Sequence, residues 1–256
     1  ECFHSAGVSG LHEGKATDCS GGRSGSTGGN RYHACMRRSS ALTGERSGRV
    51  SAGGERPPVS HRPRLAPGQV RIIGGQWRRR LLPVPSGKGM PEGLRPTPDR
   101  VRETLFNWLG QDLGGWKCLD LCAGTGALGF EAASRGAAEV RMVEQHAGLV
   151  RHLQEQARLL QATAVAVRQG DARAVLAGGG ERYDLVLLDP PYASDWYADA
   201  VRLAQQAVAD EGYLYLESGR EWTEADLLLL GWQRVRHLKA GQVHAHLLRP
   251  LREPAG

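Results

Sequence analysis

The residues with the clearest chemical potential are Asp189, Pro190, Pro191 and Tyr192, which directly follow the apolar run 185–188. Two consecutive prolines cannot extend a central strand, and they stiffen the turn after it. The turn would therefore fix the Asp189 carboxylate and the Pro190 carbonyl as hydrogen-bond acceptors, with the Tyr192 ring available for stacking. Such a set suits an exocyclic amine on a planar base, whose lone pair it would aim at a methyl donor by positioning rather than by strong base catalysis. The alternative is a proline-rich loop with an aspartate cap, which we consider the weaker interpretation for this tetrapeptide.

A glycine-rich turn follows an earlier apolar segment, and it indicates a nucleotide-like cofactor. Gly124, Gly126 and Gly129 match the pattern G-x-G-x-x-G, whose glycines let the backbone turn tightly and approach a ligand. Glu144 lies twenty residues beyond Gly124, where an acid that binds a ribose is expected. The pyrophosphate of NAD prefers neutral or positive surroundings, whereas Asp120 suits the sulfonium and ammonium of S-adenosylmethionine. The candidate cofactor residues of this turn and the next strand are Asp120, Ala123, Gly124, Thr125, Gly126 and Glu144.

A further acid, Asp171, precedes Ala172 after the third predicted strand, and its carboxylate could accept a hydrogen bond from an adenine amino group. Asp120, Glu144 and Asp171 would thus line one edge of a sheet, the edge where open α/β folds bind ligands. Each acid taken alone is more simply explained as a helix N-cap. Glu217 ends the fifth predicted strand, where it either supports the site or caps a turn.

The elements that must position these residues alternate between strands and helices. Continuous apolar runs predict strands that are buried on both faces of a parallel sheet, as in a Rossmann-like α/β fold. Two alternating runs around Ala240 and Gly241 predict a closing hairpin. The predicted strands are 117–122, 140–144, 164–168, 183–189, 212–217, 232–238 and 242–248, and the predicted helices are 126–136, 146–161 and 195–209.

An arm over residues 69–94 precedes this core, which we place at 95–256. Its alternating apolar residues predict a β-hairpin that carries Arg78, Arg79 and Arg80 on or near its turn. Thr97 and Pro98 then predict the N-cap and first residue of a helix. Residues 71–110 hold 8 basic and 3 acidic side chains, as expected of a surface that faces a polyanion, although basic residues also simply solubilise a surface.

The first 68 residues have a different composition, with 13 Gly, 10 Ser and seven residues of the Leu, Ile, Val and Phe class. So few apolar side chains cannot bury a core, and we expect a disordered Gly/Ser/Arg-rich extension. The chain has a formal net charge of +6, and no apolar run approaches the length of a membrane span. Five cysteines, an odd number, fit reduced thiols in the cytoplasm better than a disulfide framework. The histidine and cysteine spacings in the extension match no zinc pattern, so we predict no metal.

Taken together, these motifs resemble one family in detail. The segments DLCAGTG at 120–126 and DPPY at 189–192 are similar to those of amino-methyltransferases that use S-adenosylmethionine. More narrowly, RIIGGQW at 71–77, GLRPT at 93–97 and DRVRETLFN at 99–107 resemble the RsmD family of bacterial 16S rRNA guanine-N2 methyltransferases. The resemblance runs from about residue 69 to 250 and leaves out the extension.

The resemblance implies a seven-stranded methyltransferase fold whose last strand is antiparallel to the others. It also implies methylation of one guanine N2 amine in 16S rRNA, on a partly or fully assembled small ribosomal subunit, by a protein that we expect to be monomeric. Tyr192 stands where the family often has Phe, which preserves stacking. Carried over by motif, Asp120, Gly124 and Gly126 hold the methionine end of the cofactor, Glu144 the ribose and Asp171 the adenine; Asp189, Pro190 and Tyr192 hold the target base; and Arg71, Arg78, Arg79, Arg80 and Arg95 meet phosphates.

Three other functions remain open from the residues alone. Methylation of an adenine amine in DNA would use the same tetrapeptide. A non-catalytic RNA-binding factor in ribosome assembly could keep the fold without turnover. An NAD-dependent oxidoreductase fits poorly, because Asp120 and Asp189 are badly placed for it.

Overall fold

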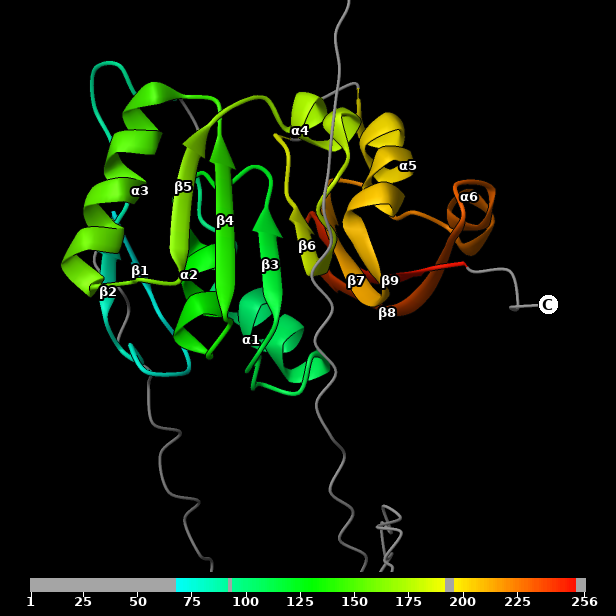
Figure 1. Cartoon of the computed structure of the whole chain (residues 1–256), viewed down its shortest axis with the longest axis horizontal. Coiled ribbons are helices and arrows are strands. Elements are labelled where there is room, and N and C mark those ends of the chain that lie inside the picture. Colours follow the sequence, from blue (N-terminus) through cyan, green and yellow to red (C-terminus); the bar gives the residue numbers. More distant parts are fainter. Residues whose placement is uncertain (1–67, 92–93, 192–195, 252–256) are drawn as a thin grey trace, which may run out of the picture. The chain divides into compact units, whose positions relative to one another are not determined.

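The computed structural model describes residues 68–91, 94–191 and 196–251. The predicted disordered extension lies outside this part except for Gly68, and so does Tyr192. A seven-stranded sheet has the order β5-β4-β3-β6-β7-β9-β8, and β9 is antiparallel to both neighbours while the other pairs are parallel (Figure 1). This arrangement confirms the expected methyltransferase-like topology and its closing hairpin. The strands are β3 (Lys117–Asp120), β4 (Glu139–Glu144), β5 (Val165–Gln169), β6 (Tyr183–Leu188), β7 (Val208–Ser218), β8 (Trp232–Ala240) and β9 (Val243–Pro250).

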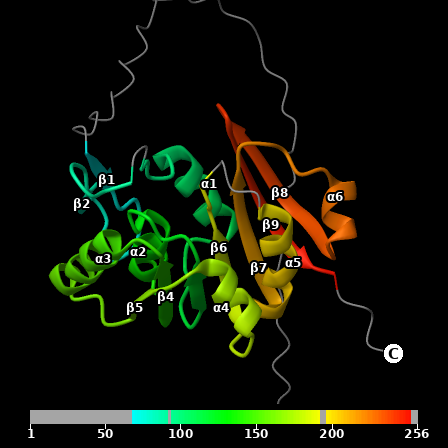
Figure 2. The ribbon, with the colours of Figure 1, turned by 90° about the horizontal axis from the view of Figure 1, so that it is seen from above.

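Six helices of the described chain cover the two faces of this sheet (Figure 2). One face carries α1 (Asp99–Trp108), α2 (Ala127–Ser134) and α3 (Ala147–Leu160), and the other carries α4 (Ala172–Gly178), α5 (Tyr197–Ala207) and α6 (Glu224–Leu229). None of the helices in the described segments is long and apolar enough to cross a membrane.

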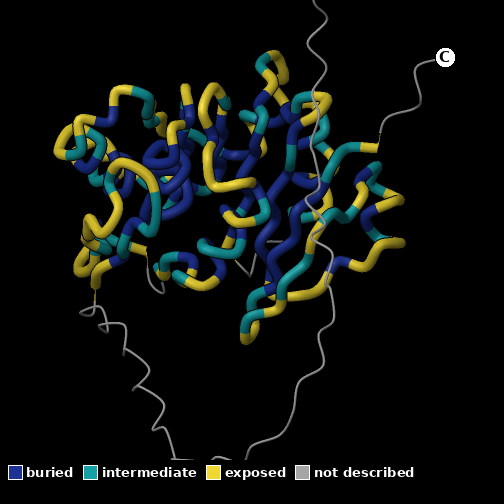
Figure 3. Tube along the Cα trace, turned by 90° about the horizontal axis from the view of Figure 1, so that it is seen from below, coloured by how far each residue is buried: buried dark blue, intermediate teal, exposed yellow. Residues whose placement is uncertain are grey.

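The central strands are buried on both faces, as their continuous apolar runs predict. In β6, Leu185 and Leu187 belong to the core under α1 and α2, whereas Val186 and Leu188 belong to the core under α4 and α5. Buried residues accordingly concentrate along the middle strands (Figure 3). The prediction is wrong for β5, which is half-buried to exposed because it forms an edge of the sheet.

The arm forms a small two-stranded antiparallel ribbon outside the main sheet, from β1 (Gln69–Arg71) and β2 (Leu81–Pro83). This confirms the predicted hairpin, with Arg78–Arg80 immediately before β2. Its apolar side chains Val70, Ile72 and Leu82 are buried in the same core as α1. Burial of these side chains makes the arm part of the packed structure.

The helices and strands differ from the predictions in several places. Helices α4 and α6 have no counterpart among the predicted helices, although Thr223 and Asp226 form a capping box that marks the start of α6. The helix predicted at 195–209 is α5, which ends at Ala207 because Val208 is already extended. Strand β7 therefore begins four residues earlier than the predicted 212–217.

Candidate active site at the carboxyl ends of the strands

The predicted glycine turn connects β3 to α2 in a conformation that needs glycine. Gly124 and Gly126 have φ values of 51° and 77°, and Gly126 is the N-cap of α2. A Cβ at Gly126 would lie 2.6 Å from Phe130 and Leu153. The flanking Ala123 and Thr125, also predicted to contact the cofactor, are 7% and 4% exposed. This turn therefore exposes its backbone to a ligand more than its side chains.

Glu144 ends β4 and holds the glycine turn in place. One carboxylate oxygen accepts the Gly124 N–H at 2.9 Å, and the other accepts the His146 N–H at 2.8 Å. Each oxygen has a second lone pair, so the carboxylate can also accept hydrogen bonds from a ligand. The predicted contact of Glu144 with a ribose remains a prediction.

Asp120, predicted to hold the methionine end of the cofactor, is the last residue of β3 and is only 2% exposed. Its carboxylate accepts the Gly129 N–H at 3.0 Å beneath the first turn of α2. Burial raises the pKa of Asp120 to about 7, and the nearby charge of Glu144 adds to the rise, while hydrogen bonds from Gly129 and Cys122 oppose it. A cationic ligand nearby would favour the ionised carboxylate.

Asp171 is the N-cap of α4, the simpler role considered for it. Its carboxylate accepts the N–H groups of Arg173 and Ala174 at 2.8 and 3.2 Å. Hydrogen bonding from the Arg173 side chain lowers the pKa of Asp171. Its side chain is 42% exposed, and the neighbouring Ala172 is buried. Contact with an adenine remains a prediction for both residues.

Asp189 follows the last residue of β6, and Pro190 and Pro191 end the strand as predicted. The Thr97 hydroxyl donates to the Asp189 carboxylate at 3.3 Å. The N-cap of α1 is Pro98, with no side-chain cap bond, so the prediction of Thr97 as N-cap is wrong. Burial raises the pKa of Asp189 well above its ordinary value, and the charges of Glu217 and Asp120 raise it further, whereas the Thr97 bond lowers it.

The other residues of this motif are only partly described. The Pro190 carbonyl, a predicted acceptor for the base amine, accepts a hydrogen bond from the Tyr197 hydroxyl at 3.0 Å. This bond leaves one carbonyl lone pair for a ligand. Pro190 is buried and Pro191 is exposed. The predicted stacking residue Tyr192 lies outside the described residues.

The connection between β2 and α1 crosses the same edge of the sheet. Met90 lies against the start of α3, since its Cε is 3.1 Å from a Cβ built on Gly148. Leu94 lies against the glycine turn, 3.5 Å from a Cβ built on Gly124. The exposed Arg95 follows, one residue after Leu94 and three residues before Pro98, the N-cap of α1, and its predicted contact with a phosphate remains a prediction.

The remaining predicted RNA contacts lie elsewhere. Arg78, Arg79 and Arg80 are exposed in a turn that docks on the C-terminal end of α2, where the Gln76 N–H donates to the Ser134 carbonyl at 2.7 Å. Helix α2 runs back from the glycine turn over eight residues, or about 12 Å. The arginine turn is therefore displaced by this distance toward the amino ends of the strands (Figure 1). Sequence reasoning did not foresee this separation.

Arg71 is half-buried and forms an ion pair with Asp99 of α1 at 2.9 Å. A surface pocket of about 190 Å³ lies beside it, away from the acids at the strand ends. Its lining residues are Arg71, Ile72, Ile73, Arg78, Arg79 and Glu103.

A buried charged cluster, which the sequence did not reveal, attaches the arm to the core. Glu131 of α2 is fully buried, and its carboxylate accepts the N–H groups of Ile73 and Gly74, each at 2.8 Å. Arg102 and Arg135 also donate to Glu131, at 3.2 and 2.9 Å. We call Glu131, Arg102 and Arg135 the arm-anchoring cluster.

The arm-anchoring cluster is connected to the candidate site through Arg102. Its guanidinium donates to the backbone carbonyls of Arg71 at 2.8 Å and Thr97 at 3.1 Å, and to Asp99 at 2.6 Å. Thr97 in turn contacts Asp189. One buried side chain thus fixes both the arm and the residue that donates to the candidate base-binding carboxylate.

Three histidines of the β8–β9 hairpin are the group within the described segments that could hold a metal ion: His237, His244 and His246. Two of their ring nitrogens, His237 Nε2 and His244 Nδ1, lie 3.1 Å apart, and His246 Nε2 accepts the Trp222 N–H at 3.2 Å. Burial lowers the pKa of His246 to about 4. These contacts give the histidines structural partners, and sequence analysis assigned them no role.

Comparison with known proteins places this chain in a family. The sequence model of the family described as "Conserved hypothetical protein 95" matches residues 70–249. The chain is 41% identical over 178 residues to the Escherichia coli protein named "Ribosomal RNA small subunit methyltransferase D", covering 69% of this chain and 87% of that protein. The chain belongs to the RsmD family. The resemblance inferred from the motifs is thereby confirmed.

Two solved structures support the fold assignment. A putative methyltransferase from Escherichia coli superimposes with a TM-score of 0.62 at 37% identity, covering 72% of this chain and 99% of that one. A putative methylase from Haemophilus influenzae gives a TM-score of 0.59 at 29% identity, covering 72% and 100%.

Proposed function

We propose that this protein transfers a methyl group from S-adenosylmethionine to the N2 amine of one guanine in the 16S rRNA of the small ribosomal subunit. The observation that carries the proposal is the position of Asp189 and Pro190 at the same sheet edge as the glycine turn, in a chain 41% identical to a small-subunit rRNA methyltransferase. This edge offers acceptors for an amine beside a turn that can hold a nucleotide-like donor.

The residues at the glycine turn fit S-adenosylmethionine. Asp120, Glu144 and Asp189 make this edge acidic, which suits a ligand with sulfonium and ammonium groups and disfavours a pyrophosphate. The turn itself would lie against the methionine end, with Glu144 at the ribose and Asp171 at the adenine. When bound, S-adenosylmethionine supplies a methyl carbon on a sulfonium that leaves as a thioether.

The protein's own contribution is to hold the amine. The Asp189 carboxylate and the free lone pair of the Pro190 carbonyl would each accept an amine N–H, which favours a pyramidal nitrogen. Held in this way, the nitrogen would aim its lone pair at the methyl group that S-adenosylmethionine supplies, and the proton that the methylated nitrogen loses would pass to water. Positioning accounts for most of the acceleration, so no strong base is required.

Methyl analysis of treated substrates tests the proposal. The full-length protein is incubated with methyl-labelled S-adenosylmethionine and unmodified small subunits, free 16S rRNA or duplex DNA. Mass spectrometry of the digested nucleosides should find labelled N2-methylguanosine from subunits or rRNA. Label in DNA adenine instead, or no transfer to any of the three, would refute the proposal.

The exposed arginine turn should strengthen RNA binding without taking part in the transfer. Replacing Arg78, Arg79 and Arg80 by Gln should weaken binding and reduce the slope of log affinity against log salt by about 0.7 to 0.9 for each phosphate that is no longer neutralised. Because the turn lies away from Asp189, the rate at saturating RNA should stay within about twofold. Arg158→Gln combined with Arg202→Gln, two exposed sites on helices, is the control; an equal change in its salt slope would argue against a specific role for the turn.

A further inference from the structure

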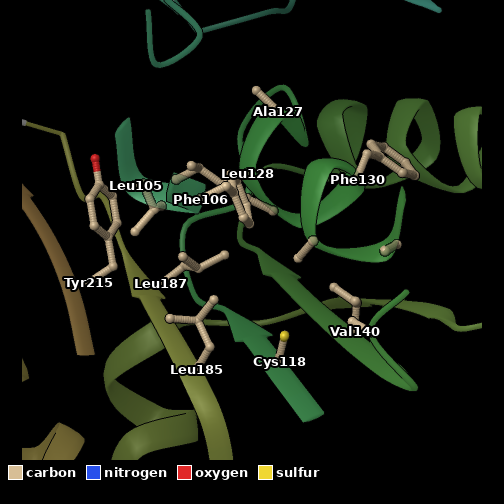
Figure 4. Close-up of a cluster of buried hydrophobic side chains, with 14 of the residues drawn as sticks. Leu105, Phe106, Cys118, Ala127, Leu128, Phe130, Val140, Leu185, Leu187 and Tyr215 are labelled. Carbon is tan, nitrogen blue, oxygen red and sulfur yellow. The ribbon is translucent and has the colours of Figure 1, made fainter. Parts of the chain in front are cut away.

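Two acids lie side by side at the end of the central strands. Leu188 of β6 pairs with Leu216 of β7 in the parallel ladder, so the next residues, Asp189 and Glu217, are neighbours across the two strands. Leu187 and Tyr215, two positions earlier, both lie in the core beneath α1 (Figure 4). Since side chains alternate along a strand, Asp189 and Glu217 face this same side.

Hydrogen bonds support this orientation. Asp189 accepts from Thr97, which directly precedes Pro98 at the start of α1, and Glu217 accepts from the Tyr215 hydroxyl at 2.9 Å. Glu217 is only 3% exposed, so its carboxylate lies below the surface beside Asp189 rather than on the open surface. Burial raises the pKa of Asp189, and the charge of Glu217 raises it further, because two neighbouring carboxylates repel each other. A ligand that brings two adjacent N–H donors would relieve that repulsion.

The Watson–Crick edges of the two aminopurines differ in this respect. Guanine presents the N2 amine next to an N1–H, and both groups donate. Adenine presents its N6 amine next to an unprotonated N1, which accepts. A second carboxylate beside the amine-binding acid therefore favours guanine and opposes adenine, because an acceptor facing an acceptor leaves both buried groups unpaired.

We propose that Glu217 is a specificity-determining residue that accepts the N1–H of the target guanine while Asp189 accepts an N2–H. This inference rests on the proposed function and adds to it the reason why the site takes guanine. No role was predicted for Glu217 beyond support of the site or a cap.

Base substitution at the target position tests the inference. After the methylated guanine has been mapped, rRNA is assembled by ligation with either guanine or 2-aminopurine at that position. 2-Aminopurine keeps the 2-amine but has an N1 acceptor in place of N1–H. The kcat/KM for each RNA is measured with the unmodified protein, with Glu217→Gln, and with Glu211→Gln as a control at the far end of the same strand, where Glu211 is exposed.

The unmodified protein and the control should prefer guanine by at least about 100-fold. Glu217→Gln should reduce this preference at least about tenfold, because the glutamine amide can either accept from N1–H or donate to N1. An equal loss for both bases, with the preference unchanged, would overturn the inference and leave the proposed function intact.

The unmodified protein alone gives a second test, which does not depend on the folding of any variant. Methylation of 2-aminopurine as fast as guanine by the unmodified protein would overturn the role of Glu217. Failure of the unmodified protein to methylate guanine in any RNA would instead overturn the proposed function, and this inference with it.

Discussion

Glu131 and Asp189 are both acids beside the core beneath α1, the first fully buried and the second half-buried, yet their surroundings are opposite. Glu131 receives two backbone N–H groups and two guanidinium groups. Among the described residues, Asp189 receives only the Thr97 hydroxyl, and its pKa is raised by burial and by neighbouring acids. A carboxylate whose charge is fully compensated holds a structure together, whereas one whose charge is poorly compensated is available to a ligand.

Glu131→Gln should give the largest loss of stability. Breaking a buried ion pair by removing one charge costs about 3 to 5 kcal/mol, and the new amide N–H groups would face the N–H of Ile73 or Gly74. Chemical denaturation measures the free energy of unfolding, and hydrogen exchange of the Ile73 and Gly74 amides should accelerate.

Glu155→Gln is the matched control for this change. Glu155 is half-exposed and pairs with Arg158 on the surface of α3, so its loss should leave the free energy of unfolding nearly unchanged. Equal effects of the two substitutions would contradict the structural role assigned to Glu131.

Asp189→Asn should lower activity without lowering stability, unlike Glu131→Gln. Methyl transfer should fall by about 100-fold to 1000-fold, because the variant replaces one acceptor with a donor at the site of the amine. The free energy of unfolding at pH 8 should stay equal or rise, since an acid with a raised pKa destabilises the fold when it is ionised.

Asp184→Asn, at the amino end of the same strand, should leave the transfer rate unchanged. Loss of stability in Asp189→Asn comparable to that of Glu131→Gln would remove the distinction between the two acids.

The pH dependence of the free energy of unfolding tests whether Asp120, like Asp189, is an acid whose charge is poorly compensated. Its folded pKa of about 7 exceeds that of an unfolded aspartate, so the folded state binds more protons between about pH 4 and 7. Its contribution to stability is therefore complete below pH 4 and is lost as the pH rises toward 7. Asp120→Asn should gain on the order of 4 kcal/mol relative to the unmodified protein over this range, as measured by denaturation at each pH. A constant difference between the two proteins at all pH values would contradict the raised pKa.

Thr97 gives the smallest and most specific effect. Thr97→Val should lower kcat/KM about tenfold, because it removes a hydrogen bond to a charged group, whereas Thr97→Ser should stay within about threefold. The Thr97 bond lowers the pKa of Asp189, so the valine variant should also move the acid limb of the pH profile to higher pH. A lower rate with an unmoved pH profile would assign Thr97 a packing role only.

The sequence predicted well what depends on local pattern. The apolar strands, the glycine turn and the prolines after Asp189 each signal their structure within a few residues. Glu131 carries no such signal, because its partners Ile73 and Gly74 lie almost sixty residues away and a glutamate in a helix usually faces solvent. Its burial follows only from the docking of the arm.

Thr97 and Glu217 show a second reason why some contacts could not be predicted from the sequence. Thr-Pro before a helix is a common start signal, and it concealed the contact of Thr97 with Asp189, 92 residues away. Glu217 could have been found from the alternation of β7 and its place beside Asp189, once the strand order was known. The position of Arg78–Arg80 toward the amino ends of the strands also follows from tertiary packing alone.

The close fit of Gly75 against α2 has a practical consequence for engineering. Its φ is 74°, and any side chain there would overlap the carbonyl oxygen of Ser134. Gly75 therefore tolerates no exchange, whereas Arg78, Arg79 and Arg80 are exposed. The turn at residues 78–80 can therefore be exchanged for sequences of different charge, which would change the affinity for nucleic acid without changing the rest of the fold.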